Sequence, residues 1–390
     1  MRWENKKLGS VLNFQRGFDI TKAIQRDGPY PVISSSGANS FHCEFMDKGP
    51  GVVIGRKGTL GTVFYADRPY WPHDTTLWVT DFHGNDPRFT YYFLKTMAFG
   101  RYDVGASNPT LNRNHIHLLD VLWPDVVIQR RIASILSAYD DLIENHRKRI
   151  AILEDMARCL YREWFVHFRY PGHESVPLVD SPLGRIPQGW EAVPASAMMD
   201  VLSGGTPKTD NPAYWGGDIP FFTPKDAHNE SWVTETEKHL TLDGLNACHS
   251  ELFPRKTLFI TARGTVGKLA LAHSQMSMNQ SCYALRPKSG ISSEYLFLTM
   301  TDAIARFKAV AIGGVFDTII VDTFSRIHLV RPPSVLVTQL TDRVEPMLTL
   351  VENLQVQINV LRRTRDLLLP RLMSGTLSVE ALATAEAAAP

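Results

Sequence analysis

The sequence predicts an α+β protein in which two similar globular segments are each followed by one long α-helix. Two observations support this prediction: two long stretches carry apolar residues at helical spacing, and short motifs recur about 200 positions apart. With 390 residues, the chain is longer than one hydrophobic core ordinarily supports. A hydrophobic fraction of 44% and a charged fraction of 21% are typical of a folded protein.

The first long helix is predicted over residues 126–168. Its apolar positions follow one another in alternating steps of four and three, which is the 3.5-residue period of a coiled-coil seam. Pro124, just before this stretch, is a helix-start signal. The expected seam residues are Ile132, Leu136, Tyr139, Ile143, Ile150 and Leu153.

The second long helix is predicted over residues 334–374 and repeats the first one 208 positions later. Glu352-Asn353 corresponds in this way to Glu144-Asn145. The same steps of four and three recur along the second stretch. Its expected seam residues are Leu340, Val344, Met347, Val351, Leu354, Ile358 and Leu361.

The two helices are expected to pair as an antiparallel coiled coil. A helix of ~40 residues is ~60 Å long, so a parallel pair would need a nearly straight connection of that length. The antiparallel arrangement makes the chain a pseudo-twofold dumbbell. His146 and Arg365 interrupt the two apolar rows. They either fix the register of the pair, face a binding partner or lie at a solvated edge, and the sequence leaves these alternatives open.

The globular segments are predicted over residues 1–125 and 189–333. Both are rich in glycine, proline, aromatic and β-branched residues, with short strand-like runs. A linker over residues 169–188 contains four prolines, and an alanine-rich tail occupies residues 375–390. Two short turns match across the segments, because the motif from Gly55 to Gly61 is echoed 206 positions later, as far as Gly267. Both are interpreted as hairpin turns whose glycines supply positive φ.

Composition excludes several classes of protein. The 41 basic and 40 acidic residues leave a net charge of +1, so the chain is not a globally basic protein that coats nucleic acid. The four cysteines include no Cys-x-x-Cys pair, which argues against a disulfide framework and a zinc–cysteine site. No leader and no apolar run of membrane length are visible, so a cytoplasmic protein without membrane contact is expected.

No catalytic residue and no metal ligand are predicted. Gly267-Lys268 lacks the Ser or Thr of a phosphate-binding loop, and the Asp210–Trp215 stretch lacks the second proline of the methyltransferase motif that it resembles. His115 and His117 are interpreted as polar positions on a strand edge. An enzyme whose motif is not recognised, such as a methyltransferase or a nuclease, remains an alternative.

The order of these features resembles the specificity (S) subunit of a type I restriction–modification enzyme. The resemblance covers Trp3 to about Glu380 and depends on the doubled globule–helix plan together with four short motifs. These motifs are Gly55 to Gly61, Gln129 to Ile132 at the start of the first helix, Gly204 to Pro207 in the second globular segment, and Leu369 to Gly375 at the end of the second helix. The second helix departs from the pattern, since it begins Val337-Thr338-Gln339-Leu340 without the Gln-Arg-Arg run of the first.

The resemblance implies a non-catalytic subunit with two target-recognition domains, one for each half of a bipartite, asymmetric double-stranded DNA target. It also implies that the helices set the length of the unread gap and bind two methyltransferase (M) subunits, and that restriction (R) subunits join through them. S-adenosylmethionine, ATP and Mg are then expected in the partner subunits, and no cofactor in this chain. The alternative is a coiled-coil scaffold that binds other proteins without DNA specificity.

Residues that contact DNA are expected on loops and turns, because Arg and Lys bind guanine or phosphate and Asn and Gln bind adenine. Side chains that recur in both segments are expected to contact phosphate or brace the turn, and side chains that differ are expected to recognise bases. The recurring group is Arg56, Lys57, Thr59, Arg263 and Thr265. The differing group is Asn108, Asn112, Arg113, Asn114, Lys208, Thr209, Lys225 and Gln280.

Overall fold

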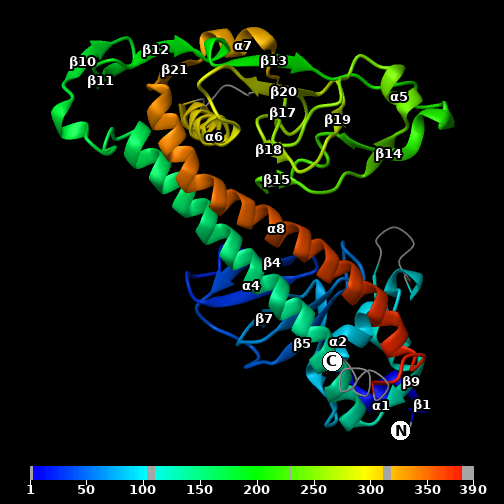
Figure 1. Ribbon diagram of the computed structural model, residues 1–390. Coiled ribbons are helices and arrows are strands. Elements are labelled where there is room, and N and C mark those ends of the chain that lie inside the picture. Colours follow the sequence, from blue (N-terminus) through cyan, green and yellow to red (C-terminus); the bar gives the residue numbers. More distant parts are fainter. Residues whose placement is uncertain (1–2, 103–109, 229, 311–317, 380–390) are drawn as a thin grey trace, which may run out of the picture. The chain divides into compact units, whose positions relative to one another are not determined.

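A computed structural model of the chain describes residues 3–102, 110–228, 230–310 and 318–379, with the backbone alone for 307–310 (Figure 1). The chain forms two compact units, of which the first is built from two separate stretches of sequence and the second from one. Unit 1 comprises Met1–Ile143 and Val360–Pro390, and unit 2 comprises Glu144–Asn359. The two predicted long helices are confirmed as α4 (Val126–Phe165) and α8 (Ser334–Met373), and each contributes one part of its length to each unit.

The globular part of unit 1 combines three small sheets with short helices. One sheet is an antiparallel pair of the first and last strands, one has four strands, and one has three. In spatial order the strands are β1 (Trp3–Lys7) and β9 (Asp120–Pro124); β2 (Asn13–Arg16), β8 (Thr76–Asp81), β5 (Gly51–Gly55) and β6 (Val63–Ala66); and β4 (Gly37–His42), β3 (Tyr30–Ser34) and β7 (Trp71–Pro72). The helices are α1 (Leu8–Val11), α2 (Pro87–Thr96) and α3 (Arg113–His117).

Unit 2 repeats this plan with one additional strand in the larger sheet. Its strands in spatial order are β12 (Glu191–Pro194) and β21 (His328–Arg331); β13 (Met199–Ser203), β20 (Cys282–Pro287), β17 (Leu258–Thr261), β18 (Leu269–Ala272) and β15 (Trp232–Val233); and β16 (Lys238–Leu240), β14 (Trp215–Phe222) and β19 (Ser277–Met278). The helices are α5 (Leu242–Asn246), α6 (Ser293–Val310) and α7 (Val321–Arg326). The expected linker also contains a hairpin of β10 (Leu178–Ser181) and β11 (Gly184–Pro187).

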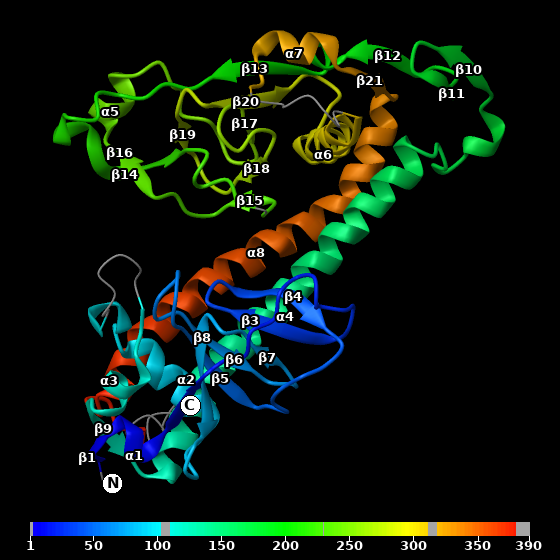
Figure 2. The ribbon, with the colours of Figure 1, turned by 180° about the vertical axis from the view of Figure 1, so that it is seen from behind.

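Within each unit the two long helices run antiparallel, as predicted (Figures 1 and 2). In unit 2 the beginning of α8 lies beside the end of α4, because the Arg343 guanidinium is 4.9 Å from the centre of the Trp164 ring. In unit 1 the end of α8 lies beside the beginning of α4, where Arg365 forms an ion pair with Asp140. Opposite ends therefore meet in both units.

Most of the expected seam residues are buried in their units. The fully or almost fully buried ones are Ile132, Leu136, Ile143, Leu340, Val344, Val351, Leu354 and Ile358. Tyr139, Ile150, Leu153, Met347 and Leu361 are half-buried. The helix α8 continues without a break through Pro346 and Pro370, so the apolar packing outweighs the loss of backbone donors at these prolines.

The two polar seam residues have different surroundings. Arg365 of α8 pairs with Asp140 of α4, and Asp140 also accepts a hydrogen bond of 2.5 Å from the hydroxyl of Tyr92 in α2. This network joins three helices inside unit 1. In unit 2, His146 is buried, and its Nδ1 has no hydrogen-bond partner among the described residues.

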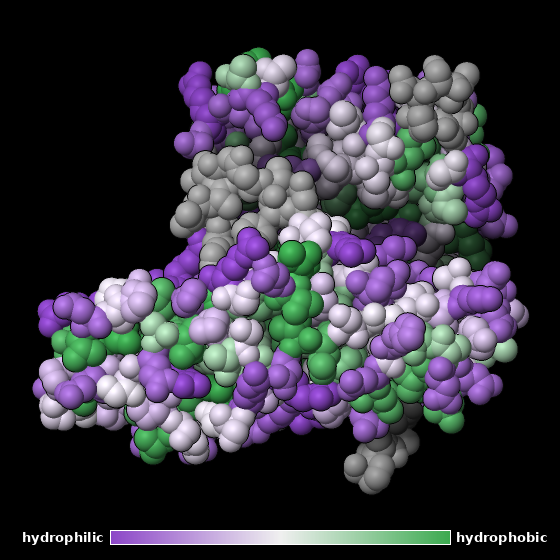
Figure 3. Space-filling model, turned by 90° about the horizontal axis from the view of Figure 1, so that it is seen from above, coloured by the Kyte–Doolittle hydropathy of each residue, from purple (hydrophilic) through white to green (hydrophobic). Residues whose placement is uncertain are grey.

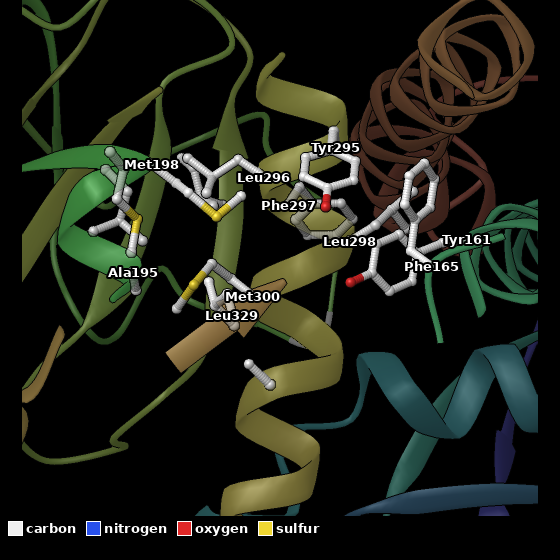
Figure 4. Packing of buried hydrophobic residues seen from close by; sticks show 14 of the residues in the cluster. Tyr161, Phe165, Ala195, Met198, Tyr295, Leu296, Phe297, Leu298, Met300 and Leu329 are labelled. Carbon is white, nitrogen blue, oxygen red and sulfur yellow. The ribbon is translucent and has the colours of Figure 1, made fainter. Parts of the chain in front are cut away.

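Helix α6 lies in the middle of the hydrophobic core of unit 2 (Figure 4). Tyr295 faces α4, where its ring centre is 5.0 Å from that of Phe165. Leu296 and Met300 point toward Met198 and Leu329, on the side of the sheet (Figure 4). The core of this unit therefore has a helix packed between the long helices and the strands.

Glu154 of α4 gives the unit a testable dependence on pH. Its carboxylate accepts a hydrogen bond from the hydroxyl of Ser231, and burial raises the pKa of Glu154 above its ordinary value, against the opposing effects of Ser231 and Arg158. The native state then binds more protons than the unfolded state, so this group makes the free energy of unfolding fall as pH rises from about 4 through the native pKa.

We expect Glu154→Gln to lose less unfolding free energy between pH 4 and pH 7 than the wild type, because the glutamine cannot ionise. Urea unfolding at a series of pH values measures this difference. Equal pH dependence in the two proteins would contradict the prediction.

In the described ranges, no helix combines the length and the apolar character needed to cross a lipid bilayer.

Candidate nucleic-acid interface

The two predicted hairpin turns have the same backbone geometry. Gly58 and Gly61 in unit 1 have φ values of +77° and +72°, and Gly264 and Gly267 in unit 2 have values of +79° and +76°. The closing hydrogen bonds also match, with Gly61 N donating to Gly55 O (2.9 Å) in one and Gly267 N to Thr261 O (2.8 Å) in the other. The interpretation as hairpin turns with left-handed glycines is confirmed.

The backbone around the turns corresponds residue by residue. Arg56 N donates to Thr75 O at 2.8 Å, and Ala262 N donates to Ser281 O at the same distance. A later segment of each unit bonds the carbonyl oxygen of the same two residues. Leu111 N donates to Arg56 O (3.0 Å), and Ile319 N donates to Ala262 O (2.9 Å).

This correspondence corrects one expectation. The counterpart of Arg56 is the buried Ala262, so Arg56 does not recur in unit 2 and its place in the recurring group was wrong. The side chains that do recur are Lys57 with Arg263 and Thr59 with Thr265. All four are exposed at the tips of their turns, where the basic ones can reach phosphate oxygens.

A cluster of charged side chains lies beside the turn in unit 1. Arg16, at the end of β2, forms an ion pair of 2.6 Å with Asp74, and Arg56 Nη1 donates to the Asp74 carbonyl oxygen at 3.3 Å. Burial and the nearby Arg16 lower the pKa of Arg56, while Asp74 raises it. Asp74 thus holds two arginines close together, Arg16 through its carboxylate and Arg56 through its backbone carbonyl oxygen.

Asp19, His73 and Asp74 also offer ligand atoms within 4.8 Å of one another, the spacing of a possible metal site. Asp74 is already paired with Arg16, and His73 Nδ1 lies 3.1 Å from the same carboxylate. The arginine supplies the positive charge that a cation would otherwise bring, so the group fits a polar binding surface better than a metal centre.

In unit 2 the corresponding surface is hollowed, with a cavity of about 470 Å³. The cavity brings together three of the predicted residues, Lys225, Arg263 and Thr265, with Lys238 and Asn279. Next to Asn279, the predicted Gln280 accepts a hydrogen bond from the hydroxyl of Thr206. Lys225 Nζ lies 3.8 Å from Glu237 Oε2, and an exposed ion pair at this distance is weak.

The other predicted residues lie elsewhere. Asn112 caps α3 by accepting a hydrogen bond from Asn114 N (2.9 Å), and Arg113 is the first residue of that helix. Lys208 and Thr209 are exposed in the loop that follows β13. Asn108 lies outside the described residues.

The histidines of α3 were assigned to the wrong kind of element. His115 and His117 lie on the helix Arg113–His117 instead of a strand edge, and His117 Nε2 accepts a hydrogen bond of 3.1 Å from Phe14 N. This bond has a structural role, since it joins α3 to β2.

Arg16, His73, Asp74, Thr206 and Asn279 were missed by sequence reasoning. Thr206 lies within the Gly204–Pro207 motif but was not singled out as a contact residue, and the other four come from segments without a local motif. Some of them could have been predicted from the constant separation of 206 positions between the two turns. This separation aligns His73-Asp74-Thr75 in sequence with Asn279-Gln280-Ser281.

Comparison with known proteins identifies the family. The type I restriction modification DNA specificity domain matches the chain twice, over residues 1–155 and 187–339. The chain belongs to the family of type I restriction–modification specificity subunits. The predicted resemblance is therefore confirmed, and the family is one of specificity subunits rather than catalytic ones.

Several relatives of this specificity family support the assignment. The HindI specificity subunit of Haemophilus influenzae is 23% identical over 346 residues, which cover 74% of this chain and 75% of that protein. The MjaIX specificity subunit of Methanocaldococcus jannaschii is 31% identical over 157 residues, which cover 39% of this chain and 36% of that protein. The crystal structure of the S subunit from M. genitalium aligns over 95% of this chain and 96% of its own, with a TM-score of 0.66 and 15% identity. It shows that the two share a fold.

Proposed function

We propose that this specificity subunit recognises a bipartite, asymmetric DNA target, with one half-site bound by the globular part of each unit. The observation that carries the proposal is the pair of matching hairpin turns, which present Lys57 and Arg263 at equivalent exposed positions. The side chains around the two turns differ, which suits two domains that bind phosphates in the same way and recognise different bases.

We also propose that the long helices bind two M subunits, which carry S-adenosylmethionine, and that R subunits with ATP and Mg join through them. Hydrophobic side chains reach the protein surface (Figure 3). On α4 and α8, six of the eight large exposed apolar side chains form three pairs separated by 208 positions, and Met156 and Leu367 have no such counterpart. The exposed fractions within each pair are similar: 57% and 58% for Val127 and Val335, 43% and 37% for Leu142 and Leu350, and 59% and 57% for Ile152 and Val360.

Exposed apolar side chains do not stabilise the fold, so folding gives no reason for their repetition. Two equivalent apolar surfaces suit two copies of one partner. This supports the proposed pair of M subunits.

The proposal is tested by co-expressing the chain with its M subunit in a host without adenine methylation and mapping methylated adenines across the genome. We expect a single motif with two defined halves and an undefined gap. Methylation that is absent, or that follows a motif with one half alone, would overturn the proposal.

The docking surface has its own test, since Ile152→Glu and Val360→Glu each place a charge at a matched position. We expect each to lower M-subunit recovery in a pull-down by about 10-fold, because a charge is costly to bury in an apolar interface. Arg147→Glu is the control, as it lies about 140° around α4 from Ile152, and it should change recovery less than twofold. Equal losses in all three variants would contradict docking at this surface.

A further inference from the structure

The surfaces beside the two hairpin turns can be compared position by position. Arg16 of β2 pairs with Leu77 of β8, and Ser203 of β13 pairs with Tyr283 of β20. After each of these residues comes a glycine that leaves no room for a side chain. A Cβ would lie 2.2 Å from His73 O at Gly17 and 2.3 Å from Asn279 O at Gly204.

The close contact of Gly17 with His73 and of Gly204 with Asn279 brings corresponding segments together in the two units. It brings the loop after β2 against the turn before β8, and the loop after β13 against the turn before β20. Asp19 and Thr206 each come two residues after their glycine, so they are equivalent positions in the two units. Asp74 and Gln280 are likewise equivalent, because they have the same spacing from their hairpin turns.

In each unit a bond between two side chains joins the two segments that meet here. In unit 1 this bond is the ion pair between Arg16 and Asp74, and in unit 2 it is the hydrogen bond between Thr206 and Gln280. The backbone arrangement is the same in both units, but the bonded side chains are charged in unit 1 and neutral in unit 2.

One member of each bond is available for another molecule. The Arg16 side chain is 55% exposed, while that of Asp74 is 19% exposed. Gln280 is exposed and Thr206 is half-buried. Each exposed group is thus held by a less exposed one, as a preorganised recognition group should be.

We propose that Arg16, oriented by Asp74, recognises a guanine in one half-site, and that Gln280, oriented by Thr206, recognises an adenine in the other. The guanidinium of arginine donates two hydrogen bonds to O6 and N7 of guanine. The amide of glutamine donates to N7 and accepts from N6 of adenine. This inference rests on the proposed function and adds to it the base class that each unit recognises.

The recurring side chains have a different role in this scheme. Lys57 and Arg263 occupy the same position in both units, so they cannot distinguish two unlike half-sites. They contact phosphates, which makes them matched controls for Arg16 and Gln280.

The test uses the purified complex of this chain with its M subunit. Fluorescent duplexes carry the motif found by methylation mapping, and unlabelled competitors carry each single base-pair substitution. In the wild type, a substitution at a recognised pair should weaken competition by about 10- to 100-fold. We expect Arg16→Ala to reduce this discrimination to about twofold at one G·C pair of one half-site, and Gln280→Ala to do the same at one A·T pair of the other.

Lys57→Ala and Arg263→Ala should weaken binding to all duplexes alike and leave the pattern of discrimination unchanged. Thr206→Val should lower discrimination at the same A·T pair as Gln280→Ala, and Thr206→Ser should restore it. That rescue would separate orientation of Gln280 from a general structural role.

The outcomes separate this inference from the proposed function. A wild-type complex that prefers no bipartite sequence would overturn the proposed function itself. A wild type with a bipartite preference, together with Arg16→Ala and Gln280→Ala variants that keep every discrimination or weaken all duplexes uniformly, would overturn the base assignment alone.

Discussion

Replacing Trp123 with alanine is expected to lower the free energy of unfolding of unit 1 by about 4 kcal/mol. Trp123 of β9 is 1% exposed, and its ring lies edge-on to Phe89 and Phe93 of α2, with centres 5.3 and 4.7 Å away. Its Nε1 donates a hydrogen bond of 2.8 Å to the side chain of Asn85. The alanine variant would leave a cavity and remove the donor of this bond.

Urea unfolding followed by circular dichroism measures this loss. Trp123→Phe is the companion variant, because it keeps an aromatic ring in the core and removes only the N–H donor and part of the volume. We expect it to cost about 1–2 kcal/mol. A loss of less than about 1 kcal/mol for the alanine variant would mean that the site collapses around the missing ring.

The second large effect is expected for Asp140→Ala, which should destabilise unit 1 by about 3 kcal/mol. Asp140 is the shared partner of Arg365 and Tyr92, and the Arg365 side chain is only 17% exposed. Removing the carboxylate leaves a largely buried guanidinium whose remaining ion pair, within the part of the chain that the structure describes, is with the exposed Asp366. It also removes the acceptor of the Tyr92 hydroxyl.

The neighbouring Asp141 provides a matched control. It forms an ion pair of 3.2 Å with Arg88, and its side chain is 63% exposed, so Asp141→Ala should cost less than about 1 kcal/mol. The double variant Asp140→Ala/Arg365→Met should be more stable than Asp140→Ala, because it also removes the largely buried charge that has lost its partner on α4. Equal effects at Asp140 and Asp141 would show that the network contributes no more than a surface ion pair.

The long helices and the hairpin turns could be predicted because their signals are local or periodic. The seam around Leu136 and Leu340 follows a period that only a helix explains, and the turn glycines stand in short motifs. The pairing of Arg16 with Asp74 could not be predicted, since these residues are 58 positions apart and meet through a sheet register that the sequence does not specify. His117 was misplaced because two histidines in five residues fit a short helix as well as a strand.

The residues that we propose for base recognition were only partly predictable for the same reason. Gln280 was a candidate because of its chemistry, but its hydrogen-bond partner Thr206 comes from the loop after β13, 74 positions earlier. Arg56 was wrongly assigned to the recurring group because a shift of one residue in the alignment of the two turns decides whether Arg56 or Lys57 corresponds to Arg263. The backbone hydrogen bonds of the two turns settle that position.

The division of the helices between the units has a consequence for synthesis on the ribosome. Leu372, Met373 and Val379, near the end of the chain, belong to the same hydrophobic core as Phe14 and Val52, near its beginning. Until these residues have been synthesised, the hydrophobic core of unit 1 is incomplete, although all residues of unit 2 have already been added to the chain. Unit 2 can therefore be completed first, and a nonsense mutation that removes only the last turns of α8 would disable the part of the protein that was translated earliest.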